Sequence, residues 1–183
     1  MMEQLKRRKA FELLRLMILF AMFGAMMFIS KIIMEFLPNV HLIGMMIVTL
    51  TLVYRVKALI PIYIFVGVTG LFYFGVWWFP YLYIWAILWA MSMFLPSPKR
   101  ISRRWGMLLY ASVCALHGFF YGALYAPVQA LMYGMGWQGM IAWIIAGIPF
   151  DIIHGISNFA VGLLIYPMPT LLMKLENKSR NKF

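Results

Sequence analysis

Lysines and arginines gather in alternate gaps between long apolar runs of this chain. Four basic clusters lie at residues 6–9, 55–57, 99–104 and 174–182, and the other gaps hold almost none. In membrane proteins these residues accumulate in short cytoplasmic loops, so we expect the four clusters on one side of a bilayer. Three further loops must then lie on the other side. The pattern predicts six transmembrane helices with both termini in the cytoplasm.

The composition points to the same class. Residues of hydrophobic type make up 64% of the chain and charged residues 11%, which leaves too few polar side chains to cover a globule in water. The net charge of +11 is then an orientation signal with some attraction to anionic lipid, and not a sign of nucleic-acid binding. We expect an all-α integral membrane protein, multi-pass, in a bacterial cell membrane.

A helix needs about 20 residues to cross roughly 30 Å of hydrocarbon, and this length divides the apolar runs. Helices are predicted near 11–29, 41–54 and 58–76, with a fourth that ends at Leu95, a fifth from Trp105 and a last helix from Pro149 to Lys174. Small residues in the fifth helix, such as Ala111 and Gly118, recur at steps of three or four and favour close helix packing. We predict one domain, 1–183, with cytoplasmic tails at 1–10 and 174–183.

Ionisable side chains inside these helices suggest a binding site, since each costs on the order of 3 kcal/mol in the membrane. Asp151, His154 and Asn158 follow at steps of three and four and share one helical face. We expect this face to meet His117 and the segment after the first helix in a pocket open to the outside, which would suit a small polar solute with an aromatic part. The candidate substrate-binding residues are Glu35, Asn39, His41, Trp85, His117, Tyr121, Gln129, Asp151, His154 and Asn158.

Structural roles compete with binding at several of these positions. Asp151 could pair with His154 or cap a helix that begins at Pro149, and one backbone carbonyl could satisfy His117. Lys31 and Glu35 are four residues apart, so they could form an ion pair at the membrane interface.

The sequence gives weaker support for a metal site or a catalytic site than for a binding site. The three histidines lie on different segments, and no H-E-x-x-H spacing fixes two zinc ligands on one helix. No serine has a G-x-S-x-G context, and the chain has no Walker motif, so we do not expect it to hydrolyse ATP itself. We predict no metal and no cofactor.

Four features together resemble the substrate-binding S components of energy-coupling factor (ECF) transporters. The size and the predicted topology, with both termini in the cytoplasm, match those of the family along nearly the whole chain. Ala21-Met-Phe-Gly-Ala25 is similar to the A-x-x-x-A signature of that family, and Ile148-Pro-Phe-Asp-Ile-Ile-His154 is similar to the P-F-[DN]-x-I-[KH] pattern that often opens its last helix. The segment with Glu35 and Asn39 looks like the loop that closes over the substrate.

The resemblance implies a non-enzymatic transporter subunit that captures a vitamin or related micronutrient. Its partners would be a transmembrane scaffold subunit, docked at Ala21 and Ala25, and two ATP-binding cassette ATPases. His154 lies at a position where a lysine is frequent in the family, so the resemblance does not identify the ligand of this chain. Two alternatives stay open: an intramembrane enzyme, with or without a metal, that uses His117, Asp151 and His154, and an assembly factor that binds no ligand.

Overall fold

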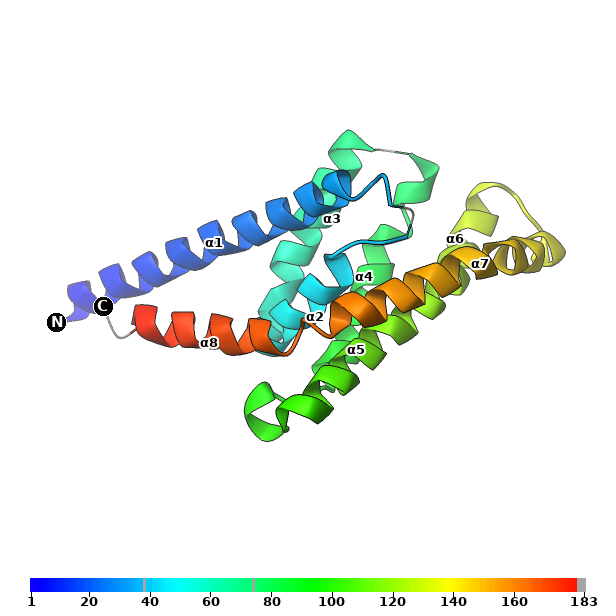
Figure 1. The fold of residues 1–183 in the computed structure, drawn as a ribbon. Coiled ribbons are helices and arrows are strands. Elements are labelled where there is room, and N and C mark those ends of the chain that lie inside the picture. Colours follow the sequence, from blue (N-terminus) through cyan, green and yellow to red (C-terminus); the bar gives the residue numbers. More distant parts are fainter. Residues whose placement is uncertain (38, 74, 181–183) are drawn as a thin grey trace.

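The computed structural model describes residues 1–37, 39–73 and 75–180, and this part of the chain is helical without strands. The all-α prediction is confirmed, while the end of the predicted C-terminal tail, 181–183, lies outside the described residues. The helices are α1 (Met2–Ile33), α2 (Ile43–Tyr54), α3 (Leu59–Phe72), α4 (Tyr81–Met93), α5 (Arg103–Phe119), α6 (Tyr121–Met132), α7 (Trp137–Gly162) and α8 (Pro167–Arg180) (Figure 1).

Four helical stretches of the described chain are long and apolar enough to cross a membrane. They are Met2–Ile33, Ile43–Phe72, Arg103–Met132 and Trp137–Gly162. The second stretch is not straight, because Arg55 has a φ of 54° between α2 and α3 and turns the chain there. α4, with 13 residues, reaches only about 20 Å. The helices are thus compatible with a multi-pass membrane protein, and the number of crossings stays a prediction.

The predicted single helix from Pro149 to Lys174 is wrong. Pro149 lies inside α7, which begins at Trp137, and the chain leaves the helix after Gly162. Pro167 then starts α8, at a position where a missing backbone N–H costs nothing. A proline inside a helix is tolerated in membranes when neighbouring groups satisfy the backbone, so Pro149 was a poor marker of a helix start.

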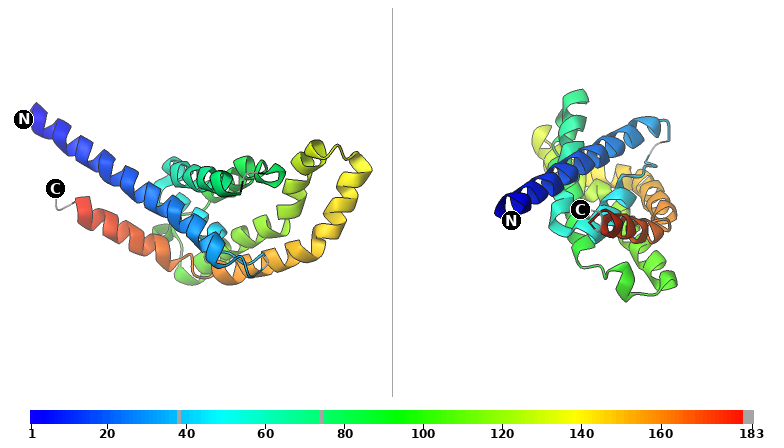
Figure 2. Two further views of the ribbon diagram at one scale, coloured as in Figure 1. Left: turned by 90° about the horizontal axis from the view of Figure 1, so that it is seen from above. Right: turned by 90° about the vertical axis from the view of Figure 1, so that its left-hand side faces the viewer.

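α5 and α7 form the most extensive helix pair of the described chain, and they lie side by side (Figure 2). Glycines allow this approach. A Cβ atom on Gly162 would lie 2.7 Å from the Ala111 Cα, and one on Gly118 would lie 3.0 Å from the Gly155 Cα. The predicted close packing along the small residues of 105–126 is confirmed, with α7 as the partner.

We expect Gly162→Val to destabilise the protein, because the atom it would meet is backbone and cannot rotate away. Overpacking of this kind costs roughly 1–3 kcal/mol. Gly147→Val is the matched control on the same helix, since a Cβ there meets nothing within 4 Å. Thermal unfolding in detergent should show a clearly lower midpoint for Gly162→Val than for Gly147→Val. Equal midpoints would contradict the packing of α7 against α5.

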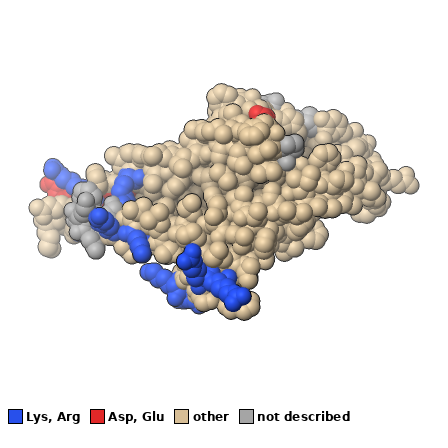
Figure 3. Space-filling view, in the orientation of Figure 1, with Lys and Arg blue, Asp and Glu red and all other residues tan. Residues whose placement is uncertain are grey.

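Basic residues gather toward the end of the molecule where both chain termini lie and along the adjoining lower edge, while the opposite part of this face shows none (Figure 3). Glu176 of α8 links three elements at this end. It pairs with Arg15 of α1 and accepts a 2.9 Å hydrogen bond from the Tyr54 hydroxyl at the end of α2. The two terminal helices are therefore joined by a partly buried ion pair.

Candidate binding site

Three histidines from three separate segments meet around two larger aromatic rings. His41 precedes α2, His117 lies in α5 and His154 in α7. The ring centroid of His154 lies 4.7 Å from that of His41 and 4.7 Å from that of Tyr121, and the rings of Trp85 and His117 are 5.8 Å apart. We call His41, Trp85, His117, Tyr121 and His154 the histidine cluster. The structure brings these five predicted residues together.

The local backbone explains how His41 reaches the cluster. Asn39 adopts a left-handed conformation with a φ of 60°, which reverses the chain between α1 and α2. The Ser157 hydroxyl on α7 donates a 2.8 Å hydrogen bond to the Asn39 carbonyl. The loop is thus fastened to α7 one turn away from His154.

The histidine cluster holds many polar atoms that lack a partner among the residues that the structure describes. The His117 Nε2 donates to the Ile84 carbonyl at 3.0 Å, as the structural alternative predicted, but its Nδ1 has no partner. His154, only 2% exposed, has none at either nitrogen. The His41 Nδ1 and Trp85 Nε1 are buried and unpartnered as well. Because a buried polar group without a hydrogen bond is costly, this concentration of five nitrogen atoms is unusual for a purely structural core.

A cavity of about 310 Å³ adjoins the histidine cluster. It contains five of the predicted residues, Glu35, Asn39, His41, Tyr121 and His154, and it adds Tyr81 and Tyr125, which continue the same aromatic surface. Trp85 and His117 lie behind this lining, in ring contact with Tyr121. The remaining lining residues are Lys31, Met34, Leu37 and Val40.

Three predicted residues lie away from the cavity lining. The Asp151 carboxylate accepts the Gly122 N–H at 2.9 and 3.1 Å, so it caps α6 rather than pairing with His154 or capping a helix at Pro149. The Asn158 amide donates to the Cys114 carbonyl at 3.4 Å between α7 and α5. Gln129 belongs to α6, and its buried Oε1 has no partner in the described part of the chain.

Charged groups stand at the edge of the cavity and contact one tyrosine. The Lys31 ammonium lies 4.2 Å from the Tyr73 ring centroid, and the Tyr73 hydroxyl donates to Glu35 at 3.2 Å. The predicted alternative of a Lys31–Glu35 ion pair is thus replaced by two contacts to Tyr73. They connect the loop after α1 with the end of α3 through exposed, weak interactions.

Burial, and to a smaller extent the nearby His117 and Lys31, lower the pKa of His41 to about 4. His41, in the loop between α1 and α2, is therefore neutral near pH 7. Its nitrogens then offer one donor and one acceptor.

We expect the protein to lose stability as the pH falls from about 6.5 toward 4. The folded pKa of His41 lies below the unfolded value, so the unfolded state binds more protons in this window. His117, His154 and Lys31 surround the His41 imidazole, and these groups stay in the variant. His41→Gln should therefore reduce the pH dependence of the unfolding midpoint without removing it. The unfolding midpoints of the variant and the wild type are measured between pH 7.5 and 4.5. If both midpoints fell equally with pH, this role of His41 would be contradicted.

α1 presents the predicted docking residues on its outside. Phe20, Gly24 and Met27 are buried, and a Cβ on Gly24 would clash with Ile64 of α3. Ala21 and Ala25 lie roughly 100° around the helix from this inner face and are exposed. They leave a shallow, exposed strip on α1.

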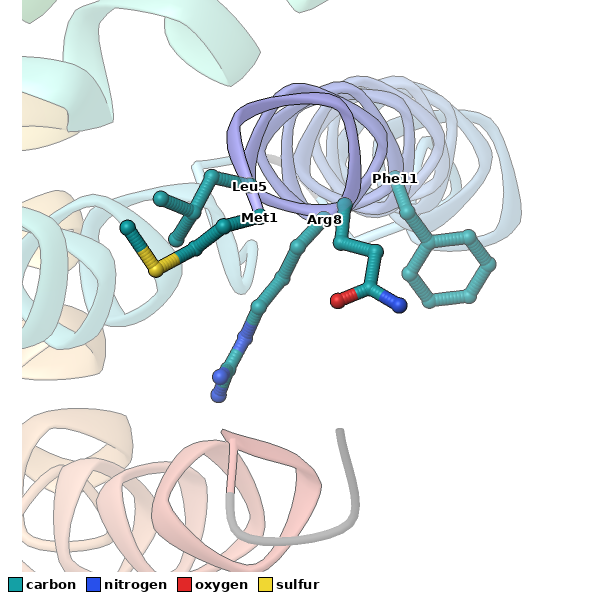
Figure 4. Close-up of a pocket in the computed structure, with 5 residues that line it drawn as sticks. Met1, Leu5, Arg8 and Phe11 are labelled. Carbon is teal, nitrogen blue, oxygen red and sulfur yellow. The ribbon is translucent and has the colours of Figure 1, made fainter.

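Two other cavities lack this chemistry. One of about 520 Å³ is lined by Met1, Gln4, Leu5, Arg8 and Phe11 at the N-terminal end of α1, where the Arg8 side chain extends toward α8 and the Phe11 ring points to another side (Figure 4). The other, of about 280 Å³, lies between α1, α2 and α8 and is lined almost wholly by apolar side chains. Neither collects buried, unpartnered polar atoms from several elements as the cavity beside the histidine cluster does.

Within the described residues, no three His, Cys, Asp or Glu side chains are placed to hold a metal ion. Comparison with known proteins adds no assignment: no protein-family model, no curated protein and no solved structure matches this chain.

Proposed function

We propose that this protein is a membrane-embedded subunit that binds a small micronutrient with high affinity and passes it to an ATP-driven importer of the ECF type. The observation that carries the proposal is the cavity of about 310 Å³, where three buried nitrogen atoms of His41 and His154 in the lining, and the Trp85 Nε1 and His117 Nδ1 behind it, lack partners among the described residues. Ligand pockets are typically concave and mostly apolar, with a few convergent polar groups. This cavity has those properties.

The placement of the cavity supports uptake from outside. Lys31 lies 25 residues beyond Lys6 on the same helix, which corresponds to about 38 Å along its axis. The cavity mouth and the basic N-terminal cluster are thus separated by more than the hydrocarbon thickness of about 30 Å. With the basic clusters in the cytoplasm, the mouth faces the outside.

The six proposed crossings are α1, α2, α3, α4, the combined α5–α6 stretch and α7. Under this count the loops at 55–57 and 99–104 lie in the cytoplasm together with both termini. α2, α3 and α4 are short for a full crossing, so the proposal requires them to lie against longer neighbours in a thinned region.

The partners follow from the same proposal. The chain carries no ATP-binding motif, so ATP hydrolysis would occur on two separate ATP-binding cassette subunits. A transmembrane scaffold subunit would dock on the strip with Ala21 and Ala25, because helices in lipid associate through close packing at small residues. The loop that carries Glu35 and Asn39 would close over the bound solute, held by Tyr73.

Native mass spectrometry of the detergent-purified protein tests the proposal. We expect a retained small molecule that is released on denaturation, or co-purification of a scaffold subunit with two ATPases. Stoichiometric zinc by elemental analysis would favour the enzyme alternative instead. Protein that carries neither ligand nor partners, and that takes up no small molecule when supplied with one, would overturn the binding function and favour an assembly factor.

A further inference from the structure

The inner part of the cavity carries no charged side chain among the described residues. Of the residues that line it, only Lys31 and Glu35 are charged, and both contact Tyr73 at the edge. Asp151, the acidic residue nearest in sequence to His154, is held by the Gly122 N–H. The groups that remain for a ligand inside are the imidazoles of His41 and His154 and the phenols of the lining tyrosines.

This chemistry disfavours a charged group at the inner end of the ligand. A buried charge needs an opposite charge or several hydrogen bonds to offset its desolvation, and no counter-charge is available there. A neutral imidazole such as that of His41 offers one donor and one acceptor, and phenol offers both. A matching ligand therefore carries donors and acceptors side by side on an uncharged edge.

The rings around the cavity favour a flat ligand. Tyr121, Tyr125 and His154 present aromatic surfaces at several angles, with neighbouring ring centroids 4.7 to 5.9 Å apart. Such surfaces pack against a planar ring by stacking or by edge-to-face contact. The volume of about 310 Å³ equals that of about ten waters at roughly 30 Å³ each, which limits the ligand to one or two rings with small substituents.

We propose that the ligand is an uncharged, planar nitrogen heterocycle of one or two rings, bound with its donor and acceptor edge against His41, Tyr121 and His154. Any charged substituent would point toward Lys31 and Glu35 at the cavity edge. This assignment of ligand class rests on the proposed binding function and narrows it, because aliphatic acids, permanently cationic rings and metal ions are excluded.

The experiment captures the ligand without assuming its identity. Detergent-purified, full-length protein is incubated with the small-molecule fraction of a rich growth medium, washed and denatured. The released compounds are identified by mass spectrometry and ultraviolet absorption. We expect one enriched compound with a neutral, planar nitrogen heterocycle, and its affinity should change less than about twofold between low and high salt, since no ion pair holds it.

Tyr121→Phe should reduce capture about tenfold, because it removes one hydroxyl from the lining and keeps the ring. Tyr133→Phe is the matched control, since Tyr133 is exposed and lies outside the cavity. Capture of an aliphatic or permanently charged compound would overturn the ligand class and leave the binding function standing. If the folded wild type captures no compound, both are overturned.

Discussion

His154→Phe is expected to reduce ligand retention roughly 100-fold while leaving the empty protein at least as stable as the wild type. Both ring nitrogens of His154 are buried and have no partner within the described protein, so the variant loses no internal hydrogen bond. It loses two possible hydrogen bonds to a ligand, each worth about 1–3 kcal/mol when a partner is left unsatisfied. Phenylalanine keeps a ring of similar size in the contacts with His41 and Tyr121.

The pairing of the two measurements makes this test specific. Ligand retention is measured by mass spectrometry of released small molecules, and stability by thermal unfolding in detergent without added ligand. A histidine with a structural role would show lower stability together with lower retention. Unchanged retention at unchanged stability would exclude His154 from the binding site, and Tyr133→Phe serves as the aromatic control outside the cavity.

Replacing both Ala21 and Ala25 with tryptophan is expected to abolish uptake into cells while ligand binding by the purified protein stays intact. Both alanines lie on the exposed side of α1 and not on the side that packs against α3. Bulky rings there would hold a docking helix away by several Å, which removes the close packing on which association in lipid depends. The cavity lies beyond the far end of the strip, so its residues keep their positions.

Met26→Trp is the matched control on the same helix. Met26 is 51% exposed and points about 140° away from Ala21 and about 100° away from Ala25, so a tryptophan there would face away from a docked subunit. Uptake is measured with the captured ligand in cells that express the full transporter. Loss of uptake in the control as well would indicate a general folding defect, and normal uptake in the double variant would exclude this strip as the docking surface.

The sequence was sufficient for features that depend on local chemistry. Alternating basic clusters and apolar runs predicted a helical, membrane-compatible protein, and small residues in α5 predicted a close helix partner. The spacing of His154 and Asn158 predicted a shared buried face, and both are buried. These predictions hold because helical periodicity and residue size act within one or two turns of the chain.

The site required contacts between distant segments. His41 and His117 are 76 residues apart, and the loop carrying His41 is placed by the Ser157 hydrogen bond to Asn39. Asp151 shares the helical spacing of His154, yet its carboxylate caps α6 instead of joining the histidines. That cap depends on the helix break at Phe120, because the break leaves the Gly122 N–H without its usual partner within the helix. No sequence motif predicts this break.

Sequence alone therefore determined the helical, membrane-compatible class of the chain and the residue types of its candidate site, because these follow from composition and from periodicity along single helices. Tertiary structure decided which polar side chains are already satisfied and which remain available to a ligand. Hydrogen bonds from Gly122 to Asp151 and from His117 to Ile84 satisfy some of them, while both nitrogens of His154 are left without a partner. Such a distinction depends on atoms brought within about 3 Å of each other by packing, which the order of residues does not specify.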